Sequence, residues 1–426
     1  MTTAPATPQP TPELPPAAGS RAPLPLRWHL TLVLAVAVAS WLLARGTVYY
    51  AQDHLRPGGG FVAEYAAHYP LFRFDAFSYR ELAEHGYAYN GDPYSSPNIV
   101  FAPAFPLFTR LVTALTPLDV MAGGFLVVHL QFLAGCVLIF LAVRQWLGVG
   151  AAWFVVLGLC FSAGSFAFHA YYSESTMLFW LALACWAWQR GWLWLTAGAV
   201  LVLGASRLTA APFCAVFAAL LLQRGWQVWR RPGGRWTAMA AGGVGAGICL
   251  GGVLAYLGGL WFACGNPFVL LPRIQMCSWQ HFHQPIRWWE LLTLKHLFVY
   301  AGAAVRRDGL FLTDIMTTNL IWTALAVVAG IYGVCRFKPP VIRWGFFGYV
   351  LLIYYSNAGT IYLNSTHRYF ALMLPIYLLA YDGYAFARRR WGPWLAAIPV
   401  ALLFGADIVY YVVYVAFFTQ GYWYYF

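Results

Sequence analysis

The segment 72–87 holds the acidic residues that are best placed to do chemistry. Three of the fourteen acidic residues of the chain, Asp75, Glu81 and Glu84, lie in it between two strongly apolar segments. Its apolar residues recur at helical spacing and Gly86 follows them, so we predict a short amphipathic helix with Asp75 at its start. A carboxylate within reach of a substrate hydroxyl can remove the proton of that hydroxyl as a general base.

The same aspartate has a purely structural alternative. Aspartate is a preferred N-cap, and Ser78 and Glu81 have the spacing of a capping box. The residue types alone leave both roles for Asp75 open.

Arginines and a second acid follow at the ends of later apolar segments. A planar guanidinium can hold a phosphate through two hydrogen bonds, which makes Arg207 and Arg368 candidate phosphate-binding residues. The alternative is that both side chains reach to lipid headgroups. Glu174 lies in a short turn with His169, where it either orients substrate or the Asp75 helix, or is a solvated loop acid.

The segment 263–313 contains His281 and His283 within one polar cluster. The sequence places no third ligand near them, and the cysteines have no zinc spacing, so we predict no metal site. A disulfide between Cys264 and Cys277 is possible in this segment but has no support from spacing. Asp407 lies deep in the last apolar run, where we expect it to pair with a neighbouring helix.

Composition sets the class of the protein. The chain is 61% hydrophobic and 9% charged, with a mean hydropathy of +0.62. Apolar runs of about 18 residues or more recur, each long enough to cross about 30 Å of hydrocarbon. We therefore predict an all-α polytopic membrane protein with about eleven transmembrane helices. The predicted spans are 28–50, 121–143, 150–168, 175–190, 192–206, 209–223, 237–262, 314–335, 344–358, 368–387 and 393–416.

The charges predict the orientation of these spans. Fourteen cations and only two acids, Glu13 and Asp382, fall on one side, which the positive-inside rule makes cytoplasmic. This topology explains the net charge of +12 without a nucleic-acid partner. Residues 1–27 are predicted to be a disordered, Pro-rich cytoplasmic tail, and residues 28–426 a single transmembrane domain.

The opposite, outer side holds two long segments, 51–120 and 263–313, and three short turns. Every polar candidate above except Asp407, which lies inside the last span, falls on that side, so we expect these segments to form the active-site face. Within them, residues 97–118 are apolar but interrupted by proline, which favours interfacial or re-entrant structure over a span.

Five motifs, in order along residues 30–390, resemble the PIG-V family, the GPI mannosyltransferase 2 proteins and their bacterial relatives within the GT-C glycosyltransferases. The motifs are Phe-Asp-Ala-x-x-Tyr from Phe74 to Tyr79, Tyr-Ser-Glu ending at Glu174, Ser-Arg at Arg207, Gly-Asn-Pro around Asn266 with Gln275 after it, and His-Arg-Tyr from His367 to Tyr369. The family has Trp-Asp where this chain has Phe74 and Asp75. We expect the loss of that indole to be tolerated by the packing and to alter how the acceptor sits.

The resemblance implies a GT-C-like bundle in which Asp75 is the catalytic acid. The donor would be polyprenyl- or dolichyl-phosphate mannose, the acceptor a glycolipid or glycan, and no metal or soluble cofactor is implied. The chemistry would face the outside of a bacterial plasma membrane, or the lumen of the endoplasmic reticulum in a eukaryote. The resemblance and the residue types together suggest these substrate-binding residues: Glu174, Arg207, Arg368, His169, Tyr79, Asn266, Gln275 and His367.

A transporter or flippase of a lipid-linked substrate is the alternative class. Such proteins place ionisable groups near the bilayer midplane and show internal repeats. This sequence shows no repeat, and its polar residues gather on one side. The asymmetry favours an enzyme.

Overall fold

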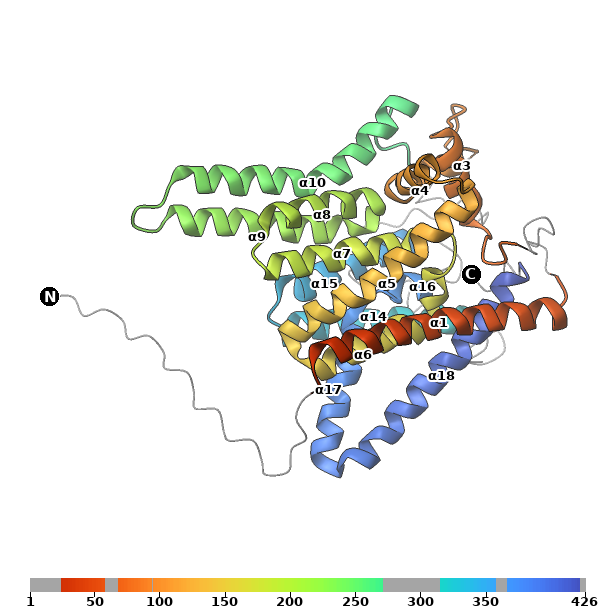
Figure 1. Cartoon of the computed structure of the whole chain (residues 1–426). Coiled ribbons are helices and arrows are strands. Elements are labelled where there is room, and N and C mark those ends of the chain that lie inside the picture. Colours follow the sequence, from red (N-terminus) through yellow and green to blue (C-terminus); the bar gives the residue numbers. More distant parts are fainter. Residues whose placement is uncertain (1–23, 58–67, 94, 271–314, 358–365, 422–426) are drawn as a thin grey trace.

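The computed structural model describes residues 24–57, 68–93, 95–270, 315–357 and 366–421. Throughout these ranges the regular structure is helical (Figure 1). The α-helices are α1 Leu26–His54, α3 Asp75–His85, α4 Ala104–Leu115, α5 Val120–Leu147, α6 Val149–Phe161, α7 Glu174–Gln189, α8 Leu193–Ser206, α9 Ala211–Trp229, α10 Trp236–Cys264, α14 Ile315–Arg336, α15 Phe346–Asn357, α16 Thr366–Phe370, α17 Leu374–Trp391 and α18 Pro393–Thr419. The tighter or wider turns are η1 Pro97–Val100, η2 Ala163–Phe168, η3 Leu208–Ala210 and η4 Val341–Gly345.

Six of the described helices are long and apolar enough to cross a membrane. They are α1, α5, η3 with α9, α10, the 319–336 part of α14, and α18. The prediction of an all-helical, polytopic membrane protein is thus confirmed. The other predicted spans are also helical but are shorter or, in α17, less apolar: the 14 residues of α8, for example, rise only about 21 Å.

Two predicted spans are interrupted. The span 150–168 ends as an α-helix at Phe161, because Ser162 is extended and the Ser165 hydroxyl bonds the carbonyl of Gly158 at 3.1 Å. The span 368–387 is divided into α16 and α17. Pro375 lies in the first turn of α17, and a continuous helix through it is prevented because proline has no N–H to donate and its ring would clash with the carbonyl of Ala371. Both interruptions leave short, non-spanning segments, η2 and α16, and α16 carries Arg368.

The prolines of 97–118 predicted an interfacial segment and not a span, and helix α4 agrees with that prediction. Its 12 residues rise about 18 Å, too little to span a bilayer. Leu107, Leu111 and Leu115 are exposed along one face, whereas Phe105 and Thr109 are buried on the other. The helix is therefore amphipathic, as an interfacial segment requires.

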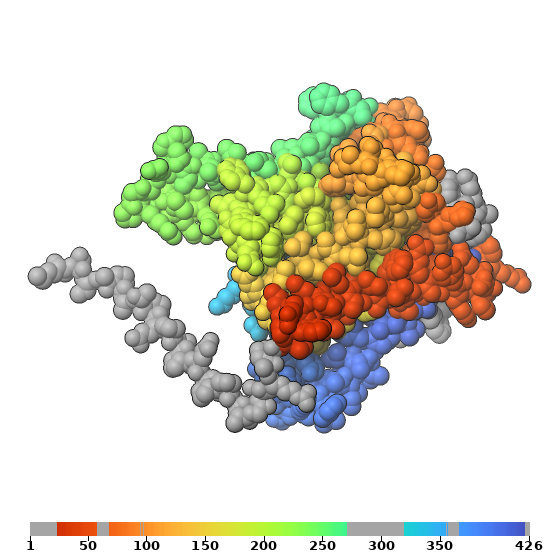
Figure 2. All heavy atoms as spheres, in the orientation of Figure 1, coloured from red at the N-terminus to blue at the C-terminus, as the bar shows by residue number. Residues whose placement is uncertain are grey.

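Successive helices alternate in direction and so bring distant turns together (Figure 1). Helix α5 packs on α7, α10 packs on α8 and α9, and α1 packs on α18 and α5. As a result the start of α7 and the end of α8 lie at the same end of the bundle as α3 and α4. The turn between α9 and α10 projects at the opposite end (Figures 1 and 2).

Candidate active site

Asp75 is the first residue of α3 and does not cap it. The N-cap position belongs to Phe74, whose φ of 50° and ψ of −113° are unusual for a residue with a side chain, and no side chain caps this end. Ser78 and Glu81 lie inside the helix, so the capping-box alternative is wrong. The Asp75 carboxylate is therefore free to point toward other elements.

That carboxylate meets Arg368, which comes from the short helix α16. Arg368 Nη2 lies 2.5 Å from Asp75 Oδ2, and the same nitrogen donates to the Tyr369 hydroxyl at 3.0 Å. The Arg368 side chain is only 8% exposed, and that of Asp75 is 25% exposed. Two residues that the sequence placed among the site candidates thus form a largely buried ion pair.

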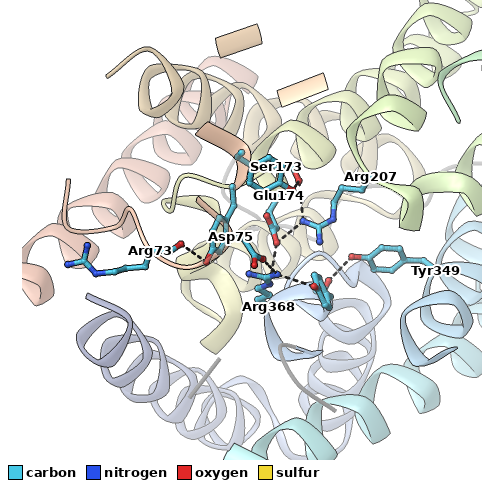
Figure 3. A network of polar contacts seen from close by, with 10 residues as sticks. Arg73, Asp75, Ser173, Glu174, Arg207, Tyr349 and Arg368 are labelled. Carbon is cyan, nitrogen blue, oxygen red and sulfur yellow. Dashed lines mark hydrogen bonds and ion pairs between the residues drawn. The ribbon is translucent and has the colours of Figure 1, made fainter. Parts of the chain in front are cut away.

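A second ion pair adjoins the first. Arg207, directly after α8, places Nη1 at 2.8 Å from Oε1 of Glu174, the first residue of α7, and donates from Nη1 to the Ser173 hydroxyl at 3.2 Å. Arg368 Nε lies 3.6 Å from the same Glu174 oxygen. The four charged side chains of Asp75, Glu174, Arg207 and Arg368 therefore form one connected group, which we call the charge network (Figure 3).

The charge network contains two acids and two arginines, so its formal charges balance. All four side chains are at most 25% exposed, and removing one member would leave a buried charge uncompensated, at a cost of about 3–5 kcal/mol. Asp75 is the most exposed of the four. Glu174 Oε2 is buried and, among the described residues, accepts no hydrogen bond.

Tyrosine rings lie beside both guanidinium groups. Arg207 and Arg368 each lie with Cζ 4.9 Å from the centre of the Tyr369 ring, and Arg368 also lies 4.8 Å from that of Tyr172. Ring faces attract cations, which helps two like charges to share one site. Burial alone would lower the pKa of Arg368, but Tyr369, Asp75 and Glu174 together raise that pKa well above its usual value. Arg368 is therefore a permanent cation.

Close packing holds α16 and α3 in place behind these charges. A Cβ on Gly164 would lie 2.2 Å from the carbonyl oxygen of His367, so only glycine lets η2 approach the backbone beside Arg368. Tyr79 is buried in α3, and its hydroxyl lies 2.6 Å from the Ser173 hydroxyl. Tyr79, predicted to bind substrate, thus joins α3 to the start of α7.

Arg73 is a buried residue of this region that the sequence reasoning missed. Its Nε and Nη2 donate to the carbonyl oxygen of Thr419, the last residue of α18, at 3.1 and 2.9 Å. The Tyr172 hydroxyl donates to the Arg73 carbonyl oxygen at 3.2 Å (Figure 3). A cation at a helix C-terminus is favourable, and this one fixes the backbone two residues before Asp75.

The structure separates other predicted residues from the charge network. His169 is buried, with Nε2 3.0 Å from the Ser40 hydroxyl and its ring stacked on His129. His367 is adjacent to Arg368, but its Nδ1 lies 2.8 Å from Asn319 Oδ1.

Helix α10 ends before an exposed Asn266, whose Oδ1 accepts a hydrogen bond from the Phe268 backbone nitrogen at 2.9 Å. Asn266 is thus another candidate whose hydrogen bond is local.

Some predictions fall outside the described residues. They concern Gln275, His281, His283 and Cys277. The disulfide between Cys264 and Cys277 therefore stays a prediction. Within the described ranges, no group of three His, Cys, Asp or Glu side chains could hold a metal ion. Asp407 lies in α18 beside the backbone of Ala163 in η2.

Comparisons with known proteins found similarity in three-dimensional structure only. No protein-family model matches the chain, and no curated protein matches it. The crystal structure of ArnT from Cupriavidus metallidurans bound to undecaprenyl phosphate is similar with 15% identity and a TM-score of 0.40, over 93% of this chain and 76% of ArnT.

A second similar structure is the Archaeoglobus fulgidus oligosaccharyltransferase tethered to an acceptor peptide containing the NVT sequon. It shows 11% identity and a TM-score of 0.42, over 92% of this chain and 55% of that protein. Likeness of this extent leaves the chemistry to be argued from the chain's own residues, and the PIG-V resemblance stays a prediction from its motifs.

Fold and site together define a class. The chain is an all-helical integral membrane protein with a buried, charge-balanced network of two acids and two arginines at one end of its bundle.

Proposed function

We propose that this chain is a membrane glycosyltransferase of the GT-C type that takes its sugar from a lipid-phosphate donor. The observation that supports the proposal best is the placement of Arg368 beside Asp75, with Arg207 joined to Arg368 through Glu174. Paired guanidinium groups bind phosphate, and an adjacent carboxylate can accept a proton from a hydroxyl. A transferase acting on a lipid-phosphate sugar needs both groups within one site.

The proposed reaction has one bond forming and one breaking at the sugar. The acceptor oxygen attacks the anomeric carbon, and its proton passes to the carboxylate of Asp75. The bond between the anomeric carbon and the phosphate oxygen breaks, and its electron pair stays on the lipid phosphate. Arg207 and Arg368 stabilise the added negative charge on that phosphate.

Within this mechanism Glu174 is a positioning residue. Its Oε1 lies within ion-pair distance of both arginines and so fixes the distance between them. Its Oε2 accepts no hydrogen bond from the described residues, which leaves it able to accept one from a sugar hydroxyl.

We propose the substrates from the motifs that resemble the PIG-V family. The sugar is mannose, the donor polyprenyl- or dolichyl-phosphate mannose, and the acceptor a glycolipid or glycan. The charge network faces the outer or luminal side of the membrane. These assignments come from the PIG-V resemblance and from the distribution of positive charge.

The test is sugar transfer from polyprenyl-phosphate mannose in membranes that contain wild type, Asp75→Asn or Glu81→Gln at matched protein levels. Glu81 belongs to the same helix but not to the charge network, so Glu81→Gln is the matched control. We expect Asp75→Asn to lose about 10²–10⁴-fold in rate and Glu81→Gln to stay near wild type.

Two outcomes would contradict the proposal. Unchanged transfer by Asp75→Asn would remove Asp75 from the chemistry. No transfer from any lipid-phosphate sugar would reject the enzyme and direct attention to transport of a lipid-linked substrate.

A further inference from the structure

Two adjoining cavities lie at the end of the bundle opposite the charge network, among α7, α8, α9 and α10. One, of about 140 Å³, is mainly apolar, and its lining includes Leu193, Trp194, Leu221 and Ala241. The other, of about 280 Å³, is polar and is lined by Trp188, Gln223, Gln227 and Arg231 among others. Arg224 and Val228 line both. The two cavities therefore adjoin at Arg224 and Val228, with an apolar and a polar lining side by side, and we call the pair the basal groove.

Small residues create the apolar half of the basal groove. A Cβ on Gly225 would lie 2.7 Å from the carbonyl oxygen of Ala238, and one on Gly242 would lie 2.8 Å from that of Leu221. Helices α9 and α10 thus approach backbone to backbone. On the α10 side the lining is Ala238, Ala241, Gly242 and Gly245, so little side-chain volume fills the space.

The polar half of the basal groove is positively charged. Arg224 lies with its guanidinium carbon 5.8 Å from the centre of the Trp188 ring, which orients it. Arg231 contributes a second cation, and no acidic residue lines either cavity. An anion is therefore the complementary ligand for this half.

Exposed tryptophans place the groove at the membrane surface. Trp192, Trp194, Trp226, Trp229 and Trp236 are all at least 39% exposed and belong to the helix ends around it. Tryptophan is enriched at the headgroup level, where the ring is apolar and its N–H meets water. At that depth the apolar half faces acyl chains and the basic half faces headgroups.

We propose that the basal groove binds one anionic phospholipid. The lipid phosphate lies at Arg224 and Arg231, and part of an acyl chain lies against Leu221 and Ala241. Basic pockets between helices attract anionic headgroups, and each arginine near the surface contributes about fivefold in affinity. An amphiphile complements both halves of the groove at once, whereas a free phosphate complements the polar half alone.

The experiment counts lipids retained by the full-length protein. Detergent-purified protein is incubated with an equimolar mixture of phosphatidylglycerol and phosphatidylcholine, and co-purifying lipid is measured by mass spectrometry. We expect enrichment of phosphatidylglycerol in wild type. Arg224→Gln combined with Arg231→Gln should lower that enrichment by about 10- to 30-fold. Arg235→Gln, in the same turn but not in the groove lining, is the matched control and should retain it.

Two further measurements show whether the apolar half or the polar half of the basal groove binds the lipid. Ala241→Leu fills the apolar half and should reduce retention of long-chain phosphatidylglycerol without removing any charge, so it tests the proposal even if the double variant folds poorly. Inorganic phosphate at millimolar concentration should not displace the lipid.

The proposal is overturned by any of three results: equal retention of both lipids by wild type, equal losses in Arg235→Gln and the double variant, or displacement of the lipid by inorganic phosphate.

Discussion

Arg368 Nη2 lies 2.5 Å from Asp75 Oδ2, although 293 positions separate the two residues in the chain. The pair joins the candidate base to the candidate phosphate-binding cation. Arg368 also lies 3.6 Å from Glu174, so its guanidinium divides its contacts between two acids. A donor phosphate would therefore meet a cation that is already oriented.

The geometry of Arg368 predicts that lysine cannot replace it. Its Nη2 contacts Asp75 while its Nε faces Glu174, and the single ammonium group of lysine cannot reproduce that fork. We expect Arg368→Lys to retain the fold but to lower transfer by about 10²-fold or more, within the range seen when one preorganised charge contact is lost. Transfer assays at saturating donor check this. Activity within a few-fold of wild type would show that charge alone is required.

The contact between Arg73 and Thr419 predicts a positioning role for Arg73. Burial lowers the pKa of Arg73 to about 10, so the side chain is still charged at neutral pH. Arg73→Gln should destabilise the protein by about 2–5 kcal/mol, because the buried carbonyl loses charged donors. It should also lower kcat more than it raises KM.

Arg73→Lys tests that role, because lysine restores the positive charge but not the two guanidinium nitrogens that bind the Thr419 carbonyl oxygen. A partial recovery of both stability and kcat is expected. If Arg73→Gln lowered thermal stability but left kcat unchanged, the residue would be structural only.

Gly164 is predicted to tolerate no side chain. In Gly164→Ala the new methyl group would lie 2.2 Å from the His367 carbonyl oxygen and would displace the backbone that carries Arg368. We expect a loss of at least about 1–3 kcal/mol in stability together with reduced transfer. Gly198→Ala is the matched control, because nothing lies within 4 Å of its new methyl group.

In Gly198→Ala, a helix interior gains alanine, so stability should rise by about 0.5–1 kcal/mol. Equal thermal shifts in the two variants would contradict the close packing described for η2.

We expect the buried His367 to make the free energy of unfolding depend on pH. Burial, with the nearby charge of Arg368 as a second cause, lowers the pKa of His367 from its usual 6.5 to about 3. Between these values the unfolded chain binds the proton and the folded chain does not, so the free energy of unfolding falls as the pH falls below about 6.5. One such group contributes at most about 1.4 kcal/mol per pH unit.

The measurement is thermal unfolding in detergent at pH 7.5, 6.0 and 5.0, for wild type and His367→Gln. The variant should lose less stability between pH 7.5 and 5.0 than wild type does. An identical pH profile for the two proteins would mean that His367 binds its proton equally in both states.

The sequence predicted the helices and the end of the bundle at which they meet, because long apolar runs and their flanking charges are local properties. The turns that carry Glu174 and Arg207 accordingly adjoin α3. The pairing of Arg368 with Asp75 was not predictable in this way, since no periodicity links two such distant positions. Sequence did identify both members, because Asp75 is one of only fourteen acidic residues and Arg368 belongs to the His-Arg-Tyr motif.

Other features depended on packing that a single sequence does not display. In the sequence, nothing distinguishes Arg73 from other cations in loops. Its contact with the end of α18 is visible only in the structure. Tyr369 was recognised only as part of a motif, whereas in the structure its ring lies within 4.9 Å of both guanidinium groups. The division of 368–387 had a local signal in Pro375, which the apolar run around it outweighed.

The bond between Arg73 and Thr419 has a consequence for how the protein is made. Synthesis proceeds from the N-terminus, so Arg73 leaves the ribosome 346 residues before the carbonyl that it binds. Until α18 has entered the membrane, the segment that carries Asp75 lacks its contact with Thr419. Arg368, the ion-pair partner of Asp75, is also synthesised only shortly before α18. A nascent chain therefore lacks both the Arg73–Thr419 contact and the Asp75–Arg368 ion pair, and the proposed site is complete only when α18 has been inserted.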